Sequence, residues 1–132
     1  MSSDRKRVLY YPDRKQVVHY GERYGLYTEQ GIVDFAIQAG WLLTIVSDDV
    51  GHLAPALKLV NASRYDGLIT IIPESDSAIG KIMRSATLPT LNLFDSEGEV
   101  NLPEVLTDNH AIGRMGADHL MDQGIEHLAF IR

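Results

Sequence analysis

Carboxylate and amide side chains follow several short apolar runs along the chain. The charged or amide residues at these places are Asp13, Arg14, Asp48, Glu74, Asp95, Asp108 and Asn109. They are rich in hydrogen-bond acceptors, with a guanidinium and an amide as donors, which suits a polyol or another small polar ligand. The alternative is that these positions are polar because loops lie on the surface, and that Asp108 only caps a helix. Composition alone leaves both interpretations open.

The motifs of several enzyme and nucleotide-binding classes are absent from the sequence. The segment at 11–25, YPDRKQVVHYGERYG, contains neither G-x-G-x-x-G nor a P-loop, and Gly80-Lys81 falls within a predicted helix. There is no G-x-S-x-G elbow, so serine hydrolase chemistry lacks its usual turn, and without a cysteine thiol catalysis has no nucleophile. A phospho-receiver domain would need an acidic pair after the first strand, where only Asp13 stands. We therefore expect neither an enzyme nor a cofactor.

Five residues near the C-terminus have side chains of the kinds that bind metals. They are His110, Asp118, His119, Glu126 and His127. No H-E-x-x-H motif is present, and the spacing of His110 and His119 places them on different sides of a helix. Surface histidines explain the pattern better, so no metal site is expected.

Short apolar runs alternate with segments of helical periodicity. Strands are predicted at 8–11, 41–46, 66–72, 90–94 and 127–131, and helices at 24–40, 53–62, 77–86 and 108–122. Helix 24–40 is expected to bury the face formed by Leu26, Gly31-Ile32, Phe35-Ala36 and Ala39. Strand 41–46 is apolar enough to be covered on both faces. The alternation predicts an α/β fold, a three-layer open parallel sheet with helices on both faces. Ligands bind such sheets at the carboxyl ends of the strands, where the seven polar residues stand.

The totals describe a globular chain of one domain. It has 132 residues, of which 45% are hydrophobic and 23% charged, and its net charge is −6. That charge argues against binding of nucleic acid by this segment, because phosphates require a positive surface. No apolar run approaches the roughly 18 residues that span a bilayer, so we expect a cytoplasmic protein without membrane contact. The end at Arg132, after a predicted strand with no closing helix, suggests a piece of a longer protein.

The block at 88–132, LPTLNLFDSEGEVNLPEVLTDNHAIGRMGADHLMDQGIEHLAFIR, carries a series of spaced motifs. They are Leu88-Pro89, Val105, Asp108-Asn109, Gly113-Arg114, His119-Leu120, Gly124 and Leu128-Ala129-Phe130-Ile131. In this order and spacing they resemble the sensor domains of the lactose/galactose repressor (LacI/GalR) family. The run Tyr65–Ile69 resembles that family's "DGIIL" strand. Residues 24–36 with Gly40-Trp41 resemble its first helix and next strand, in the form typical of xylose operon regulators of the AraC class.

The resemblance implies one lobe of a periplasmic-binding-protein type I fold, with residues 1–132 as the N-terminal lobe of the sensor. A small sugar, similar to xylose, would bind between two lobes, and DNA would be bound only by a domain outside this chain. The seven polar residues would line one wall of the cleft. The loop at 14–24 departs from the family's pattern in being longer and more charged. The alternative in the same fold is a solute-binding protein of a sugar transporter.

Two further expectations concern packing and assembly. Gly113 and Gly116 would let their helix lie close to the sheet. The regulators of this family act as homodimers, and the exposed side of helix 24–40, around Tyr27 and Gln30, would either carry the dimer contact or be a solvated face.

Overall fold

The computed structural model describes residues 5–12, 22–46, 64–71, 87–93, 102–129 and 131. The elements are β1 (Arg7–Pro12), α2 (Glu22–Ala39), β2 (Leu42–Ile45), β3 (Gly67–Ile71), β4 (Thr90–Asn92) and α5 (Asn109–Asp122). Each lies where the sequence predicts an element of its type. The helices predicted at 53–62 and 77–86 lie outside the described residues.

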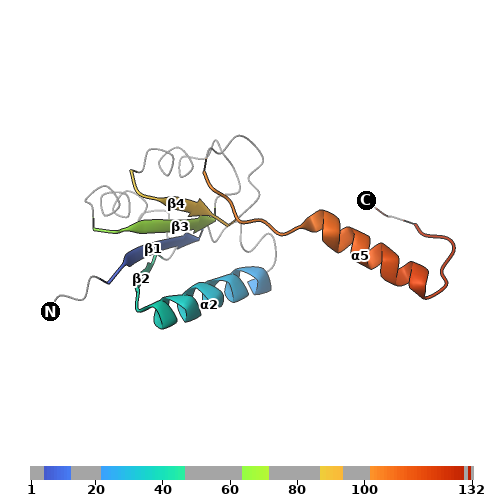
Figure 1. Ribbon diagram of the computed structural model, residues 1–132, viewed down its shortest axis with the longest axis horizontal. Helices are drawn as coiled ribbons and strands as arrows, with labels where there is room; N and C mark the ends of the chain where they lie inside the picture. The colour runs from blue at the N-terminus through green and yellow to red at the C-terminus, as the bar shows by residue number, and fades with distance from the viewer. Residues whose placement is uncertain are drawn as a thin grey trace.

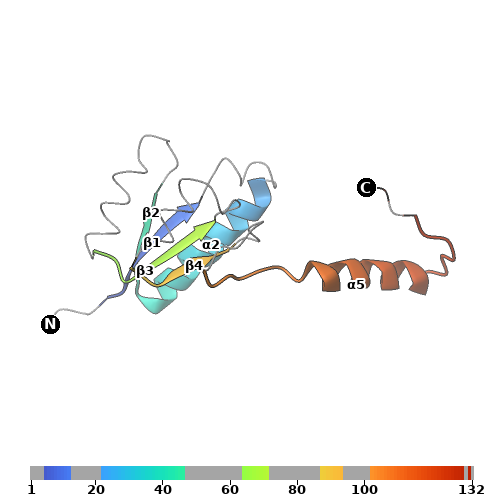
Figure 2. The same ribbon diagram turned by 90° about the horizontal axis from the view of Figure 1, so that it is seen from above.

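The four strands form one parallel sheet in the order β2-β1-β3-β4 (Figure 1). β1 lies in its interior, with Leu9 opposite Thr44 of β2 and Leu68 of β3. Parallel neighbours cannot be joined by a tight turn and need a crossover connection, usually a helix. α2 provides the crossover between β1 and β2, and it covers one face of the sheet in both views (Figures 1 and 2). The predicted parallel α/β fold is confirmed.

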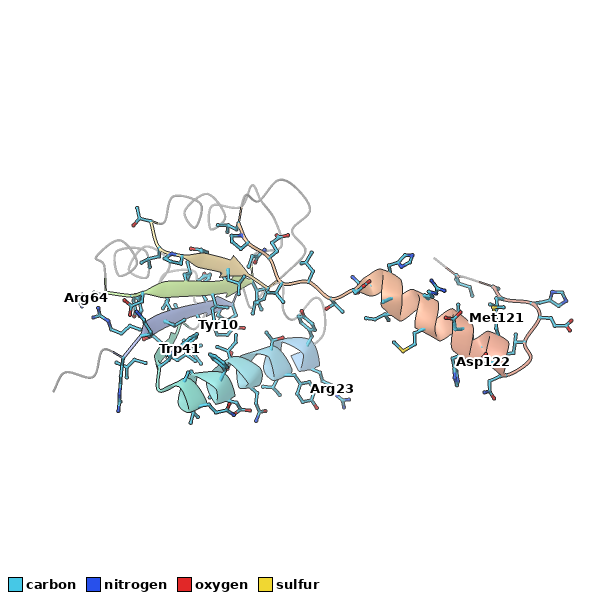
Figure 3. All side chains as sticks on the ribbon, viewed as in Figure 1. Tyr10, Arg23, Trp41, Arg64, Met121 and Asp122 are labelled. Carbon is cyan, nitrogen blue, oxygen red and sulfur yellow. The ribbon has the colours of Figure 1, made fainter. Side chains whose placement is uncertain are left out.

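The core is built around β1, which is buried on both faces. Leu9, Tyr11 and Leu68 form a cluster on one face, and Leu102 is among the partly buried side chains packed against it. Tyr10 belongs to the opposite face because side chains alternate along a strand, and Figure 3 shows it on the side that α2 covers. A strand covered on both sides reads as a continuous apolar run, which explains why residues 8–11 identified β1 so clearly.

The buried face of α2 agrees only in part with the predicted one: Ala36 is buried and Ile32 half-buried as expected, but Gly31 and Ala39 are exposed. Gly25 and Ala36 are buried, and the residues between them that share this face are half-buried, while Leu26 and Phe35 are 65% and 54% exposed. The predicted burial of Leu26 and Phe35 was wrong because small residues, glycine and alanine, make the closest approach to the sheet. Phe35 instead packs edge-on against Trp41, with ring centroids 5.0 Å apart. Gly40 ends the helix in a left-handed conformation, with φ of 68°, which glycine adopts without strain.

β2 is also more exposed than predicted. Leu42 and Ile45 are 49% and 36% exposed, so the expectation of a strand covered on both faces was wrong. The reason is its position in the sheet: among the residues that the structure describes, β2 is an edge strand paired with β1 alone. An apolar run predicts a strand, but it does not show whether that strand has one or two neighbouring strands in the sheet.

The predicted strand at 127–131 is not formed. Residues 127–129 and 131 have no strand conformation, and Ile131 is 92% exposed. A strand is stable only when its backbone pairs with a neighbour, and among the described residues this segment pairs with none. The cap before it is as predicted: Gly124 has φ of 78°, and its N–H donates to the carbonyl of Met121 at 2.9 Å.

α5 projects away from the sheet (Figures 1 and 2). None of its residues, all of which the structure describes, is buried. Among the described residues, no neighbouring atom lies within 4 Å of the place where a side chain at Gly113 or Gly116 would begin. The predicted close approach of this helix to the sheet was therefore wrong for this chain. Within the described ranges, no helix is long and apolar enough to cross a membrane.

Candidate functional site

The carboxyl ends of the four strands meet at one edge of the sheet. Parallel pairing requires this, and the register places Pro12 of β1 beside Ile71 of β3, and Thr70 beside Asn92 of β4. The arrowheads in Figure 1 mark this edge, which faces α5. It is the edge at which parallel α/β sheets bind ligands.

Five of the predicted ligand contacts follow strands that end here. Asp13 and Arg14 come directly after β1, and Asp48, Glu74 and Asp95 come soon after β2, β3 and β4. These five residues lie outside the described ones, so their side chains stay a prediction. The structure does bring together the strand ends that precede them.

Asp108 and Asn109 stand at the start of α5. Asp108 is the N-cap: its Oδ1 accepts a hydrogen bond from the Ala111 N–H at 2.8 Å. The Asn109 N–H donates to the carbonyl of Thr107 at 2.9 Å, and both residues are exposed. The capping role considered for Asp108 is thus confirmed. A second role in ligand binding stays a prediction for both residues.

A row of buried polar side chains crosses the sheet just inside this edge. Tyr11, Thr70 and Asn92 are register partners on β1, β3 and β4, so their side chains point to the same face. Thr70 and Asn92 are fully buried, and Tyr11 is nearly so. The Thr70 hydroxyl donates to the Tyr11 carbonyl at 3.0 Å, and Asn92 Nδ2 donates to Oε1 of Glu104 at 3.2 Å. Burial of these groups is tolerated because each is hydrogen-bonded.

The sequence analysis did not select Thr70, Asn92 or Glu104. The signal available was a polar residue inside an apolar run, Thr70 in GLITI and Asn92 in TLNLF. Polar residues in such runs need a partner when buried. Because Thr70 and Asn92 have no accessible surface and bond within the protein, the row supports the edge from inside and does not itself contact a ligand.

The described residues offer no place for a metal ion. Among them, no three His, Asp or Glu side chains lie close enough to hold one. Asp118, one of the residues considered for a metal, instead pairs with Arg114 at 3.7 Å, and both side chains are largely exposed.

Comparison with known proteins gives no match by sequence. No protein-family model matches the chain, and no curated protein matches it.

The fold is shared with solved structures of transcription regulators. CcpA of Lactococcus lactis superposes with a TM-score of 0.64 at 18% identity, over 95% of this chain and 45% of that chain. A protein described as a transcriptional regulator LacI, from Bacillus cereus subsp. cytotoxis NVH 391-98, superposes with a TM-score of 0.65 at 17% identity, over 91% of this chain and 44% of that one. The parallel sheet thus matches a lobe of the LacI-type, periplasmic-binding-protein-like fold, and the chain spans less than half the length of either structure.

Proposed function

We propose that this chain is a lobe of the ligand-sensing domain of a transcription regulator, and that it binds a small sugar at the carboxyl edge of its sheet. The observation that carries the proposal is this edge, where β1, β3 and β4 end in register and polar residues follow each of them. The likeness of the fold to two transcription regulators, over 95% and 91% of this chain, supports it.

The chemistry of the edge suits a sugar. Sugar hydroxyls both donate and accept hydrogen bonds, so carboxylates, amides and a guanidinium can all contact them. In the proposed mechanism a second lobe, in a longer protein, supplies the opposite wall of the cleft. The ligand then shifts an open–closed equilibrium by its differential affinity for the two states.

The size of that shift sets how many contacts are needed. Moving the equilibrium from 1:99 to 99:1 takes about 5.5 kcal/mol of differential binding. A hydrogen bond to a charged group contributes about 1.5–3 kcal/mol. Two to four such bonds made only in the closed state are therefore enough, which the predicted contacts, Asp13, Arg14, Asp48, Glu74, Asp95, Asp108 and Asn109, could provide.

DNA binding is assigned to a separate domain. The chain carries a net charge of −6, which opposes contact with phosphates. The finer assignment, to a xylose-responsive regulator of the AraC class, rests on the form of residues 24–41; neither solved structure is described in those terms. A cytoplasmic location belongs to the same proposal.

The regulator is proposed to act as a homodimer that uses the outer face of α2. Tyr27, at 71% exposure, lies on this face with Gln30, and Ile37 is exposed as well. Aromatic residues with this much accessible area are enriched in protein interfaces. Replacing Tyr27 by glutamate should lower the dimer fraction measured by sedimentation. Replacing Met121 of α5, also exposed, by glutamate should not. Equal effects from both variants would count against this face.

Calorimetry with xylose on the longer protein tests the ligand. Asp108→Asn keeps a good capping residue but removes a charged acceptor, so it should weaken xylose binding about tenfold without unfolding α5. Asp118→Asn, on the same helix, serves as the matched control. Unchanged affinity in Asp108→Asn and in alanine variants of Asp13 and Asp48 would refute the proposed site.

Two observations separate the alternatives. The isolated 132-residue chain should show no xylose binding at millimolar concentration, because half of the hydrogen-bonding partners would be missing. A secretory leader in the longer protein, without a DNA-binding domain, would favour a transport-type solute-binding protein.

A further inference from the structure

Residues 103–105, in the connection that leads to α5, are hydrogen-bonded to the edge of the sheet. Glu104 makes a single parallel bridge with Asn92, on the outer side of β4. The Asn92 N–H donates to the carbonyl of Pro103 at 2.9 Å, and the Asn92 carbonyl accepts from the Val105 N–H, also at 2.9 Å. Asn92 Nδ2 adds the third bond, to Glu104 Oε1 at 3.2 Å. One residue of β4 thus holds three consecutive residues of the connection.

The environment makes this attachment firm. Asn92 is completely buried, with none of its surface accessible. Leu102 packs against the cluster of Leu9, Tyr11 and Leu68, which ties down the start of the same segment. A hydrogen bond away from water is costly to break because neither partner is rehydrated, so the side-chain bond adds to the two backbone bonds.

The chain beyond this attachment is held far less. Residues 105–108 are exposed, and α5 contributes no buried residue. Residues 106–108 make backbone hydrogen bonds only with the start of α5, among the residues that the structure describes. The Asn109 N–H donates to the carbonyl of Thr107 at 2.9 Å, and the Ile112 N–H donates to the carbonyl of Asp108 at 3.1 Å. Figure 1 shows the connection leaving the sheet at β4 and running out to α5.

We propose that Asn92 and Glu104 form a clamp, in which the Glu104 carboxylate positions α5 by fixing the point at which the chain leaves the sheet. All rotation of α5 relative to the sheet is then confined to residues 106–108, directly before Asp108 and Asn109. Glu104 is a positioning residue: it sets the orientation of these two proposed ligand contacts without touching the ligand. That purpose rests on the proposed function, whereas the clamp itself is tested without ligand.

The experiment compares Glu104→Ala with Glu104→Gln in the 132-residue chain. Glutamine retains an oxygen that can accept from Asn92 Nδ2, and alanine does not. Hydrogen exchange measured by NMR reports the Val105 amide, which is bonded to Asn92, and the Leu68 amide, which is bonded to Pro89 inside the sheet. Glu104→Ala should speed exchange at Val105 about tenfold and leave Leu68 unchanged. Glu104→Gln should resemble the parent chain, as should Glu126→Ala, a control in an exposed segment.

A distance measurement tests the positioning. The chain has no cysteine, so spin labels can be placed at Gln38→Cys on α2 and Asp118→Cys on α5, both exposed. The distribution of distances between the labels should broaden in Glu104→Ala and return to the parent width in Glu104→Gln. Equal acceleration at Val105 and Leu68, failure of glutamine to rescue, or an unchanged distribution would each overturn the clamp. Loss of xylose binding in the longer protein's site variants has no bearing on these readouts, so the two proposals fail separately.

Discussion

Replacing Gly116 by alanine is expected to stabilise α5 by about 1 kcal/mol, because glycine costs that much in a helix interior relative to alanine. The structure determines whether this substitution raises or lowers the stability of α5. Among the described residues, nothing lies within 4 Å of the new methyl group, so no clash offsets the gain in helix propensity. The same holds for Gly113. The two glycines are i,i+3 neighbours on α5, so the double substitution should gain about 1–2 kcal/mol rather than a strict sum.

The gain should be local. α5 has no buried residue, so its opening is not tied to unfolding of the sheet. Exchange of the α5 backbone amides should slow about fivefold in Gly116→Ala, the factor that corresponds to 1 kcal/mol. The Leu68 amide of β3 serves as the internal reference and should not change.

Gly124→Ala provides a control of opposite sign. Gly124 has φ of 78°, which alanine adopts only with strain, so this variant should destabilise the end of α5 by about 1 kcal/mol. Faster exchange throughout α5 in Gly116→Ala would refute the reasoning, since it would mean that an atom already occupies the space beside this glycine. The same substitution can also be made in the longer protein to which we propose that this lobe belongs. A loss of stability there, with a gain in the isolated chain, would show that the small-residue face of α5 is covered in the whole molecule.

Further predictions concern the sheet and the surface, each measured by urea denaturation. Leu9→Ala should cost about 2–5 kcal/mol because Leu9 is fully buried, whereas Leu42→Ala at the half-exposed edge should cost about 1 kcal/mol. Similar losses for the two would contradict the assigned core. Thr70→Val keeps the shape but removes the hydroxyl bond to the Tyr11 carbonyl and should cost about 1 kcal/mol, while Thr70→Ser should keep that bond. Arg114→Ala removes only an exposed ion pair and should change the free energy of unfolding by less than about 0.5 kcal/mol.

The parts of the fold that the sequence predicts well depend on local patterns. β1 was predicted from the run Val8–Tyr11, because a strand buried on both faces is apolar along its whole length. The start and end of α5 followed from the capping chemistry of Asp108 and Gly124. Each of these patterns lies within a few residues of the element that it predicts.

The errors concern properties that need distant partners. Helical spacing predicted α2 and the burial of Ala36, but it missed Gly25, which carries little hydrophobic signal and yet is buried. Residues 127–131 have the composition of a strand, but pairing depends on a neighbour that periodicity does not reveal. The bond between Asn92 and Glu104 joins an apolar run to a loop, and nothing local to either residue indicates it.

The candidate site also has one part that the sequence predicts and one that it does not. The expectation that polar residues gather at one edge followed from parallel pairing alone, and the register of β1, β3 and β4 bears out that the strand ends meet there. The buried row of Tyr11, Thr70 and Asn92 behind that edge was not anticipated. A buried polar residue can be suspected from sequence, but its partner is fixed by tertiary structure.

The interior place of β1 affects how the chain can be assembled during synthesis. β1 is synthesised before the other strands of this sheet, yet it needs a neighbour on each side, β2 and then β3. The unit β1-α2-β2 is complete within the first 46 residues, so it can form while the rest is still being translated, and β3 and β4 then add to its open side in order. Growth in one direction from β1-α2-β2 predicts that nascent chains with residue 46 outside the ribosome and residue 67 still inside it already contain protected β1 amides.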